Sequence, residues 1–237
     1  MILGRHMSRA ACIKDAKALD INAVQVFVKS PQIWACPALP SKPTDFGNLY
    51  VCAHASYLIN LGKDSVESRQ GLVREARLCK AIGIKDLVVH PGSGTVEWCI
   101  ENLNRCAPYW PEGVRLLIEN TAGQGNYIGG DMIDVMIIVT ALEDDLDIGI
   151  CFDTAHAWQY GLDPLEYLDT PEIKVFHVND SLTPKSSHKD RHANIGYGTM
   201  PIDIFEALAQ IKDVPLIMET PELHAEKDIK IFRRMAR

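Results

Sequence analysis

The sequence predicts an α/β fold, a (β/α)8 TIM barrel that forms a single domain over residues 1–237. Eight short apolar segments recur along the chain, most end at a polar residue, and most precede an amphipathic helical pattern. Continuous apolar runs such as LVV, LLI and GICF are typical of parallel strands that are covered on both faces. Eight strand–helix units in 237 residues match a small barrel of this type.

The expected strands occupy residues 2–6, 23–28, 50–54, 86–90, 115–120, 148–153, 174–180 and 215–220. Helical patterns lie at residues 10–19, 65–82, 95–105, 131–142, 201–211 and 226–235. After the sixth strand, residues 156–174 leave room for about two or three helical turns. The connection between the second and third strands carries Pro31, Pro37, Pro40 and Pro43, each of which removes a backbone donor. We therefore expect a Pro-rich loop there in place of a helix.

The charge balance excludes one kind of nucleic-acid-binding segment. The chain has 24 Lys and Arg against 31 Asp and Glu, a formal charge of −7, which rules out a strongly basic nucleic-acid-binding tail. Binding to nucleic acid is not excluded, because bound cations can reverse the local field.

Seven cysteines without a CxxC pair predict buried thiols in a reducing compartment, not disulfides or a thiolate metal site. No apolar run is long enough for a transmembrane helix, and the first residues lack a signal-peptide core.

Metal-ligand residue types stand at the ends of six of the eight expected strands, where barrel enzymes place their chemistry. A single histidine in such a place is more often structural, and we interpret His6 in that way or as a support for a ligand. Six converging residues are harder to explain as structure, because buried carboxylates are costly unless cations pair with them. The six residues are His54, His90, Glu119, Asp153, His177 and Glu219.

Three further residues extend this set. His156 follows Asp153 by three positions, and Asp190 and His192 alternate on the loop after the seventh strand. Five histidines and four carboxylates suit Zn²⁺, Mn²⁺ or Fe²⁺ better than Ca²⁺ or Mg²⁺ alone. At about four positions per ion, with shared ligands and water, these residues can serve three ions. Four carboxylates against three divalent ions leave a local charge of +2, which favours a phosphate or phosphodiester substrate.

Seven stretches carry these residues in order. They are HASYLINLG (54–62), VVHPGS (88–93), IENTAGQG (118–125), CFDTAHAW (151–158), FHVNDS (176–181), KDRHANIGYG (189–198) and LIMETP (216–221). In this order the chain resembles the endonuclease IV family, the apurinic/apyrimidinic (AP) endonucleases of the xylose isomerase-like barrel superfamily. The resemblance covers nearly all of the chain and includes the expected residue type at all nine metal positions.

The resemblance implies three zinc ions, for which Mn²⁺ or Fe²⁺ can substitute. It divides the nine residues into three ligand sets, namely His54, His90 and Glu119; Glu119, Asp153, His177 and Glu219; and His156, Asp190 and His192. The family hydrolyses the DNA phosphodiester on the 5′ side of an abasic site in base excision repair and leaves a 3′-hydroxyl and a 5′-deoxyribose phosphate. Glu119 would be the catalytic residue that orients the attacking water.

The resemblance also places loops against DNA. Tyr57 and Leu58 would lie on a loop that enters the minor groove at the abasic site, although an aromatic residue packed under a loop is the structural alternative. Lys189 and Arg191 flank a metal-ligand residue and would touch the DNA backbone, or would lie on a solvated loop.

A second DNA-contacting loop would supply Lys29, Gln32 and Ile33. The family usually has an arginine near Gln32, which helps fill the gap in the base stack, and Ile33 could act as an apolar wedge. The connections at 35–49, 94–114 and 157–173 are shorter than usual for the family, so we expect fewer phosphate contacts.

Two other functions stay open at this point. A single-metal sugar isomerase or epimerase of the same superfamily would need only the four residues of the second ligand set and leaves five unexplained. A catalytically weak DNA-lesion-binding relative would explain Gln32 and the short loops, but not the complete ligand set.

We expect a monomer that binds double-stranded DNA with abasic sites and no membrane. Its expected location is the cytoplasm, on the nucleoid if the cell is prokaryotic.

Overall fold

A closed ring of eight parallel strands forms the centre of the computed structural model, which describes residues 1–236. The strands are β1 (Ile2–His6), β2 (Ala23–Phe27), β3 (Tyr50–His54), β4 (Asp86–Val89), β5 (Arg115–Glu119), β6 (Ile148–Asp153), β7 (Ile173–His177) and β10 (Pro215–Met218). Around the ring they follow chain order, and β1 closes the barrel by pairing with both β2 and β10. The predicted (β/α)8 barrel is confirmed.

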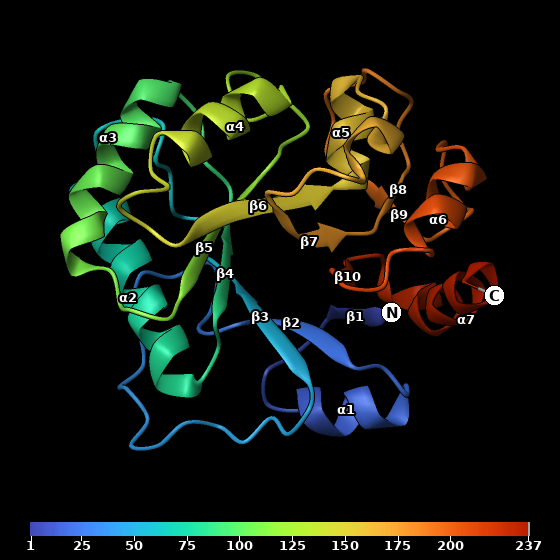
Figure 1. The fold of residues 1–237 in the computed structure, drawn as a ribbon, viewed down its shortest axis with the longest axis horizontal. Helices are drawn as coiled ribbons and strands as arrows, with labels where there is room; N and C mark the ends of the chain where they lie inside the picture. The colour runs from blue at the N-terminus through green and yellow to red at the C-terminus, as the bar shows by residue number, and fades with distance from the viewer. Residues whose placement is uncertain (237) are drawn as a thin grey trace.

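The helices lie outside the ring of strands (Figure 1). Within residues 1–236 the α-helices are α1 (Cys12–Ala18), α2 (Val66–Ile82), α3 (Val96–Cys106), α4 (Met132–Thr140), α5 (Thr154–Tyr160), α6 (Ile202–Leu208) and α7 (Ala225–Met235). Short 3-10 helices accompany them, η1 (Ala107–Tyr109), η2 (Pro164–Tyr167) and η3 (Glu222–His224). Side-chain caps explain several starts: the Ser65 hydroxyl accepts the Ser68 amide before α2, and the Thr95 hydroxyl accepts the Trp98 amide before α3. The short helices α5 and η2 match the connection predicted after the sixth strand.

The inside of the barrel is filled by a layer of small and apolar side chains. Seven strands contribute one buried residue each, and these are Ala23, Cys52, Val88, Leu117, Cys151, Val175 and Ile217. A larger core lies between the strands and the surrounding helices. Because side chains alternate along a strand, the residue two positions later on each strand points to the same interior, one level nearer the carboxyl end. The interior layer is therefore the floor on which any site at that end rests.

The connection from β2 to β3 contains no helix, as the prolines predict, and is a plain coil in Figure 1. The seventh strand is shorter than predicted, because β7 ends at His177 instead of residue 180. Residues Asp180–Ser181 form β8, which pairs antiparallel with β9 (His192–Ala193) in a small ribbon outside the barrel. The Asp180 carboxylate, which accepts the backbone amides of Gly196 and Gly198, holds the chain on this path. His192 therefore lies on a short strand and not on an irregular loop.

All seven cysteines are free thiols, and the predicted burial is confirmed for six of them, whereas Cys36 is half-buried. Among residues 1–236, no helix combines the length and the apolar character that a membrane crossing requires.

Candidate metal centre

A ring of polar side chains lies directly above the barrel floor. On six strands the residue two positions after the floor residue is a histidine or a carboxylate. The pairs are Cys52 and His54, Val88 and His90, Leu117 and Glu119, Cys151 and Asp153, Val175 and His177, and Ile217 and Glu219. The strand-end pattern seen in the sequence is thus a single layer in space, and three of its members, Glu119, Asp153 and His177, are fully buried.

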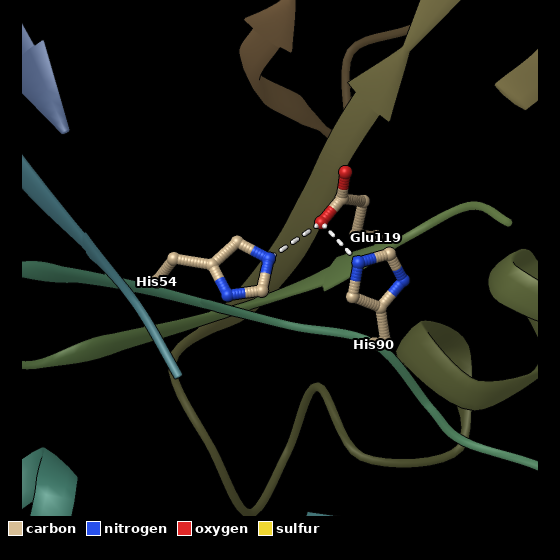
Figure 2. A group of neighbouring side chains, drawn as sticks. All are labelled: His54, His90 and Glu119. Carbon is tan, nitrogen blue, oxygen red and sulfur yellow. Dashed lines mark hydrogen bonds and ion pairs between the residues drawn. The ribbon is translucent and has the colours of Figure 1, made fainter. Parts of the chain in front are cut away.

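The first ligand group is His54, His90 and Glu119, whose ligand atoms lie within 4.8 Å of one another. Figure 2 shows both imidazole rings directing a nitrogen at the same carboxylate oxygen. Nε2 of His54 lies 3.0 Å from Glu119 Oε2, and Nε2 of His90 lies 3.3 Å from that oxygen. Nδ1 of His54 lies 2.7 Å from the Ala55 carbonyl oxygen, to which it donates in the tautomer that frees Nε2.

The second group consists of Glu119, Asp153, His177 and Glu219. His177 Nδ1 is its centre, at 2.8 Å from Glu119 Oε1, 3.4 Å from Glu219 Oε2 and 3.9 Å from Asp153 Oδ2. Glu119 therefore belongs to both groups, with one carboxylate oxygen facing each. Cys151 lies close to Glu119 and His177, but burial and the neighbouring carboxylates raise its thiol pKa well above the ordinary value. A raised thiol pKa disfavours the thiolate form, and the absence of a thiolate ligand stays a prediction.

The third group lies at the α5 side of the site. By distance it consists of Asp153, His156 and His192, so Asp153 stands where the sequence prediction has Asp190. Asp190 is still close, because its Oδ1 lies 3.4 Å from Nε2 of both histidines. The Asp153 carboxylate caps α5 by accepting the His156 amide at 2.8 Å, which explains why a ligand three residues later turns toward the same centre. All nine predicted ligand residues therefore meet in one cluster.

The histidines and carboxylates of the cluster lie close enough to shift one another's pKa values. Burial alone would lower the pKa of His177, but the carboxylates of Glu219 and Glu119 raise it to about 9. Burial would raise the pKa of Glu119, but His90 and His177 hold it well below its ordinary value. Desolvation lowers the pKa of His90 to about 4. The carboxylates thus require positive charge beside them, which bound divalent ions would supply without the protons.

One buried atom is placed to serve as a ligand of a divalent cation. Nε2 of His192 has no hydrogen-bond partner among residues 1–236, although Asp190 Oδ1 lies 3.4 Å away and Asp153 Oδ2 lies 3.7 Å away. A buried ring nitrogen left unpaired between two carboxylates is a ready ligand set for a divalent ion. Imidazole and carboxylate donors without thiolate match zinc and its first-row neighbours.

Most of the residues predicted to contact DNA lie on the surface around this cluster. The side chains of Tyr57 and Ile33 are 62% and 52% exposed, and Gln32, Lys189 and Arg191 are exposed as well. Leu58 is half-buried. A cavity of about 510 Å³ opens beside the cluster and is lined by Tyr57, Leu58, His54, His90 and His156, among others.

Lys29 is a correction to the sequence prediction. Its side chain is 2% exposed, and its ammonium lies 3.2 Å from Glu75 Oε1 in α2. The same ammonium donates to the carbonyl oxygens of Ser30 and Ile33 at 3.1 and 2.6 Å. A lysine whose donors are occupied inside the protein is not available to a phosphate, so its role is to hold the loop that carries Gln32 and Ile33.

Three buried amides were not found by the sequence reasoning. Asn179 donates to Asp153 Oδ2 at 2.6 Å and accepts the Glu219 backbone amide at 2.8 Å. Asn120 exchanges two hydrogen bonds with the backbone of Asp153. Gln25 contacts both His177 and Glu219. The signal for Gln25 was its position two residues after Ala23, which is the spacing shared by the six strand-end ligands.

Comparison with known proteins gives a consistent result. Residues 13–235 match the xylose isomerase-like TIM barrel family. The chain is 33% identical to a probable endonuclease 4 of Nitratidesulfovibrio vulgaris over an alignment 284 positions long, which covers 100% of this chain and 99% of the relative. A probable endonuclease 4 of Phocaeicola vulgatus is 30% identical, with 98% of both chains covered. The crystal structure of endonuclease IV from Thermus thermophilus superposes with a TM-score of 0.87 at 29% identity, covering 99% of this chain and 98% of that one.

Proposed function

We propose that this chain, which belongs to the endonuclease IV family of the xylose isomerase-like TIM barrels, hydrolyses the phosphodiester of duplex DNA on the 5′ side of abasic sites, using three divalent metal ions. It is an AP endonuclease and therefore a phosphodiester hydrolase. One observation carries the three-ion proposal: eight of the nine ligand residues form three groups, Asp190 lies 3.4 Å from both histidines of the third, and Glu119 faces the first two groups with different oxygens. A single-metal sugar isomerase would need the second group alone and leaves the histidines of the other two without a role.

The proposed cofactor is zinc, with Mn²⁺ or Fe²⁺ as substitutes. His54, His90 and Glu119 would hold one ion, the second group would hold another, and His156, Asp190 and His192, with Asp153 beside them, would hold the third. When bound, such ions act as Lewis acids on the phosphate and lower the pKa of water, so that hydroxide is available at neutral pH.

Glu119 acts from the centre of the cluster. Its carboxylate is fully buried, and His54 and His90 face one oxygen while His177 faces the other. This clamp holds the carboxylate plane fixed between the first two ligand groups. We assign to Glu119 the orientation of the attacking water, because a carboxylate so held accepts the hydrogen bond of a water molecule in one direction only.

The residues around the centre, all exposed except the half-buried Leu58, form the proposed DNA surface. Tyr57, Leu58, Gln32 and Ile33 stand on two neighbouring loops that contact each other, since the Tyr57 amide donates to the Pro31 carbonyl at 3.2 Å. Lys189 and Arg191 lie on a separate loop, next to Asp190. The proposed working form is a monomer in the cytoplasm.

The test is nicking of a duplex that carries one tetrahydrofuran abasic analogue, with metal content measured on the same sample. The analogue cannot undergo β-elimination, so a 3′-hydroxyl product requires hydrolysis. We expect cleavage with about three ions per chain. His177→Ala should lose cleavage and bound metal, whereas His224→Ala, which changes a histidine outside the cluster, should lose neither cleavage nor metal. Three ions without cleavage would favour a lesion-binding protein, and one ion without cleavage would favour a sugar isomerase.

A further inference from the structure

We propose that Gln25 is a positioning residue that fixes the tautomer of His177 and the orientation of Glu219, so that both present electron pairs to the same divalent ion. This inference rests on the metal centre of the proposed function. Gln25 is the β2 member of the ligand layer, two residues after the floor residue Ala23, and it is fully buried. Its side chain is uncharged and is neither a histidine nor a carboxylate, the ligand types of this cluster. Its role is therefore to act through its neighbours.

The Gln25 amide bridges the two ligand residues. Its Oε1 lies 2.7 Å from His177 Nε2, and its Nε2 donates to Glu219 Oε1 at 2.5 Å. The second proton of the amide faces His6 Nδ1 at 3.1 Å. The reversed amide would place a carbonyl oxygen against the Glu219 carboxylate, which is repulsive, so the network itself fixes this orientation.

This orientation decides which nitrogen of His177 can bind a metal. A carbonyl oxygen only accepts, so Nε2 of His177 must carry the proton that it shares with Gln25. The electron pair of the neutral ring is then on Nδ1, the atom that faces Glu119, Glu219 and Asp153. An imidazole with the other tautomer would direct an N–H at the ion site and could not serve as a ligand.

His177 differs in this respect from two other histidines of the cluster. His54 and His156 have Nδ1 at 2.7 and 2.9 Å from backbone carbonyls and turn Nε2 toward the carboxylates. Their orientation is therefore set by main-chain acceptors, which a side-chain substitution does not remove. The orientation of His177 depends on the side chain of Gln25. The only other polar contact of Gln25 Oε1 among residues 1–236 is the sulfhydryl of Cys52, at 3.6 Å. One residue can therefore be exchanged to release one ligand histidine.

The experiment compares Gln25→Met, Gln25→Glu and Asn102→Leu with the wild-type holoenzyme. Met keeps the length of glutamine without its hydrogen bonds, whereas Glu keeps the acceptor for His177 and loses the donor to Glu219. Asn102 is the matched control, a fully buried amide that donates to the carbonyls of Leu61 and Lys63 away from the cluster. Zinc stoichiometry under a chelator series and the imidazole nitrogen shifts of His177, from long-range ¹H–¹⁵N correlation spectra, are the two readouts.

We expect Gln25→Met to bind one of the three ions about 10- to 100-fold more weakly and to lose the Nε2–H signature of His177. Gln25→Glu should retain that signature and lose less affinity, and Asn102→Leu should match wild type in both readouts. Equal affinity and unchanged nitrogen shifts in Gln25→Met would overturn the inference, as would an equal loss in Asn102→Leu. Wild-type protein with a single ion would instead overturn the three-ion centre, while the shifts of His177 would still test Gln25.

Discussion

The buried pair of Lys29 and Glu75 gives the sharpest stability prediction. Both side chains are nearly inaccessible, at 2% and 1% exposure, and the second carboxylate oxygen of Glu75 accepts the Ser56 amide at 2.9 Å. The substitution Lys29→Met removes the ammonium and keeps an apolar stem of similar length. Glu75 is then a buried carboxylate without a cation.

The cost follows from the protonation that this carboxylate needs. Burial already raises the pKa of Glu75, and the Lys29 ammonium opposes that rise. Without the ammonium the group takes up a proton in the folded state, and protonating a carboxyl of ordinary pKa at pH 7 costs about 3.7 kcal/mol. That value lies within the range of about 3–5 kcal/mol for a broken buried ion pair. At pH 5.5 the same reasoning gives about 1.6 kcal/mol.

The sign of the pH effect is fixed. The folded variant binds a proton that the unfolded chain lacks above its ordinary carboxyl pKa, so its stability relative to wild type falls as pH rises. Urea unfolding of both proteins at pH 5.5 and 7, with excess chelator in all samples, measures this difference, and Lys29→Met combined with Glu75→Gln should recover most of it. A loss below about 1 kcal/mol at pH 7 would refute the buried-pair reasoning. A DNA salt slope smaller by about 0.9 in the single variant would return Lys29 to the phosphate backbone.

Two further predictions concern DNA binding and the metal-free cluster. Gln32→Arg adds a charge to an exposed loop residue, so the slope of log K against log salt should steepen by about 0.9 without a change in metal content, and an unchanged slope would place Gln32 away from the phosphates. In metal-free protein His177 has a pKa of about 9, so its protonated ring stabilises the folded state. This stabilisation is complete below about pH 6.5 and is lost as pH rises through 9. The melting temperature should therefore fall between pH 7 and 10 in wild type and less in His177→Asn, whereas equal profiles would contradict the assignment.

The barrel and the ligand cluster were predictable because both follow from local pattern. Buried parallel strands read as continuous apolar runs, and their carboxyl ends meet at one face of the barrel, so His54 and Glu119 can be placed together although they lie far apart in the chain. The division of the third group stays a prediction, since Asp153 and Asp190 both lie near His156 and His192.

The remaining errors came from tertiary contacts that no local pattern carries. In the sequence, Lys29 lies on a loop predicted to contact DNA, so it was predicted to bind DNA as well. Only the structure shows that Glu75 of α2 faces it. Two-residue strands such as β8 and β9 have no periodicity, so the ribbon that carries His192 was assigned to a loop. A neutral glutamine on a strand has no charge signal, so the spacing that Gln25 shares with the six ligands marks its place, and its contacts with His177 and Glu219 show its role.

The coil between β2 and β3 separates two parts of the molecule by their local stability. Within residues 1–236, no backbone amide of residues 32–43 donates a hydrogen bond, whereas the ligands sit at the ends of fully paired strands. Amide hydrogen exchange should therefore be fast along this coil and limited by global unfolding in the strands beneath the cluster. Under the proposed function, ordering the loop that carries Gln32 and Ile33 on DNA would cost about 1–2 kcal/mol of entropy per ordered residue, while the ligand cluster would keep its geometry. The proposed recognition and the proposed chemistry would thus lie in regions that open on different timescales.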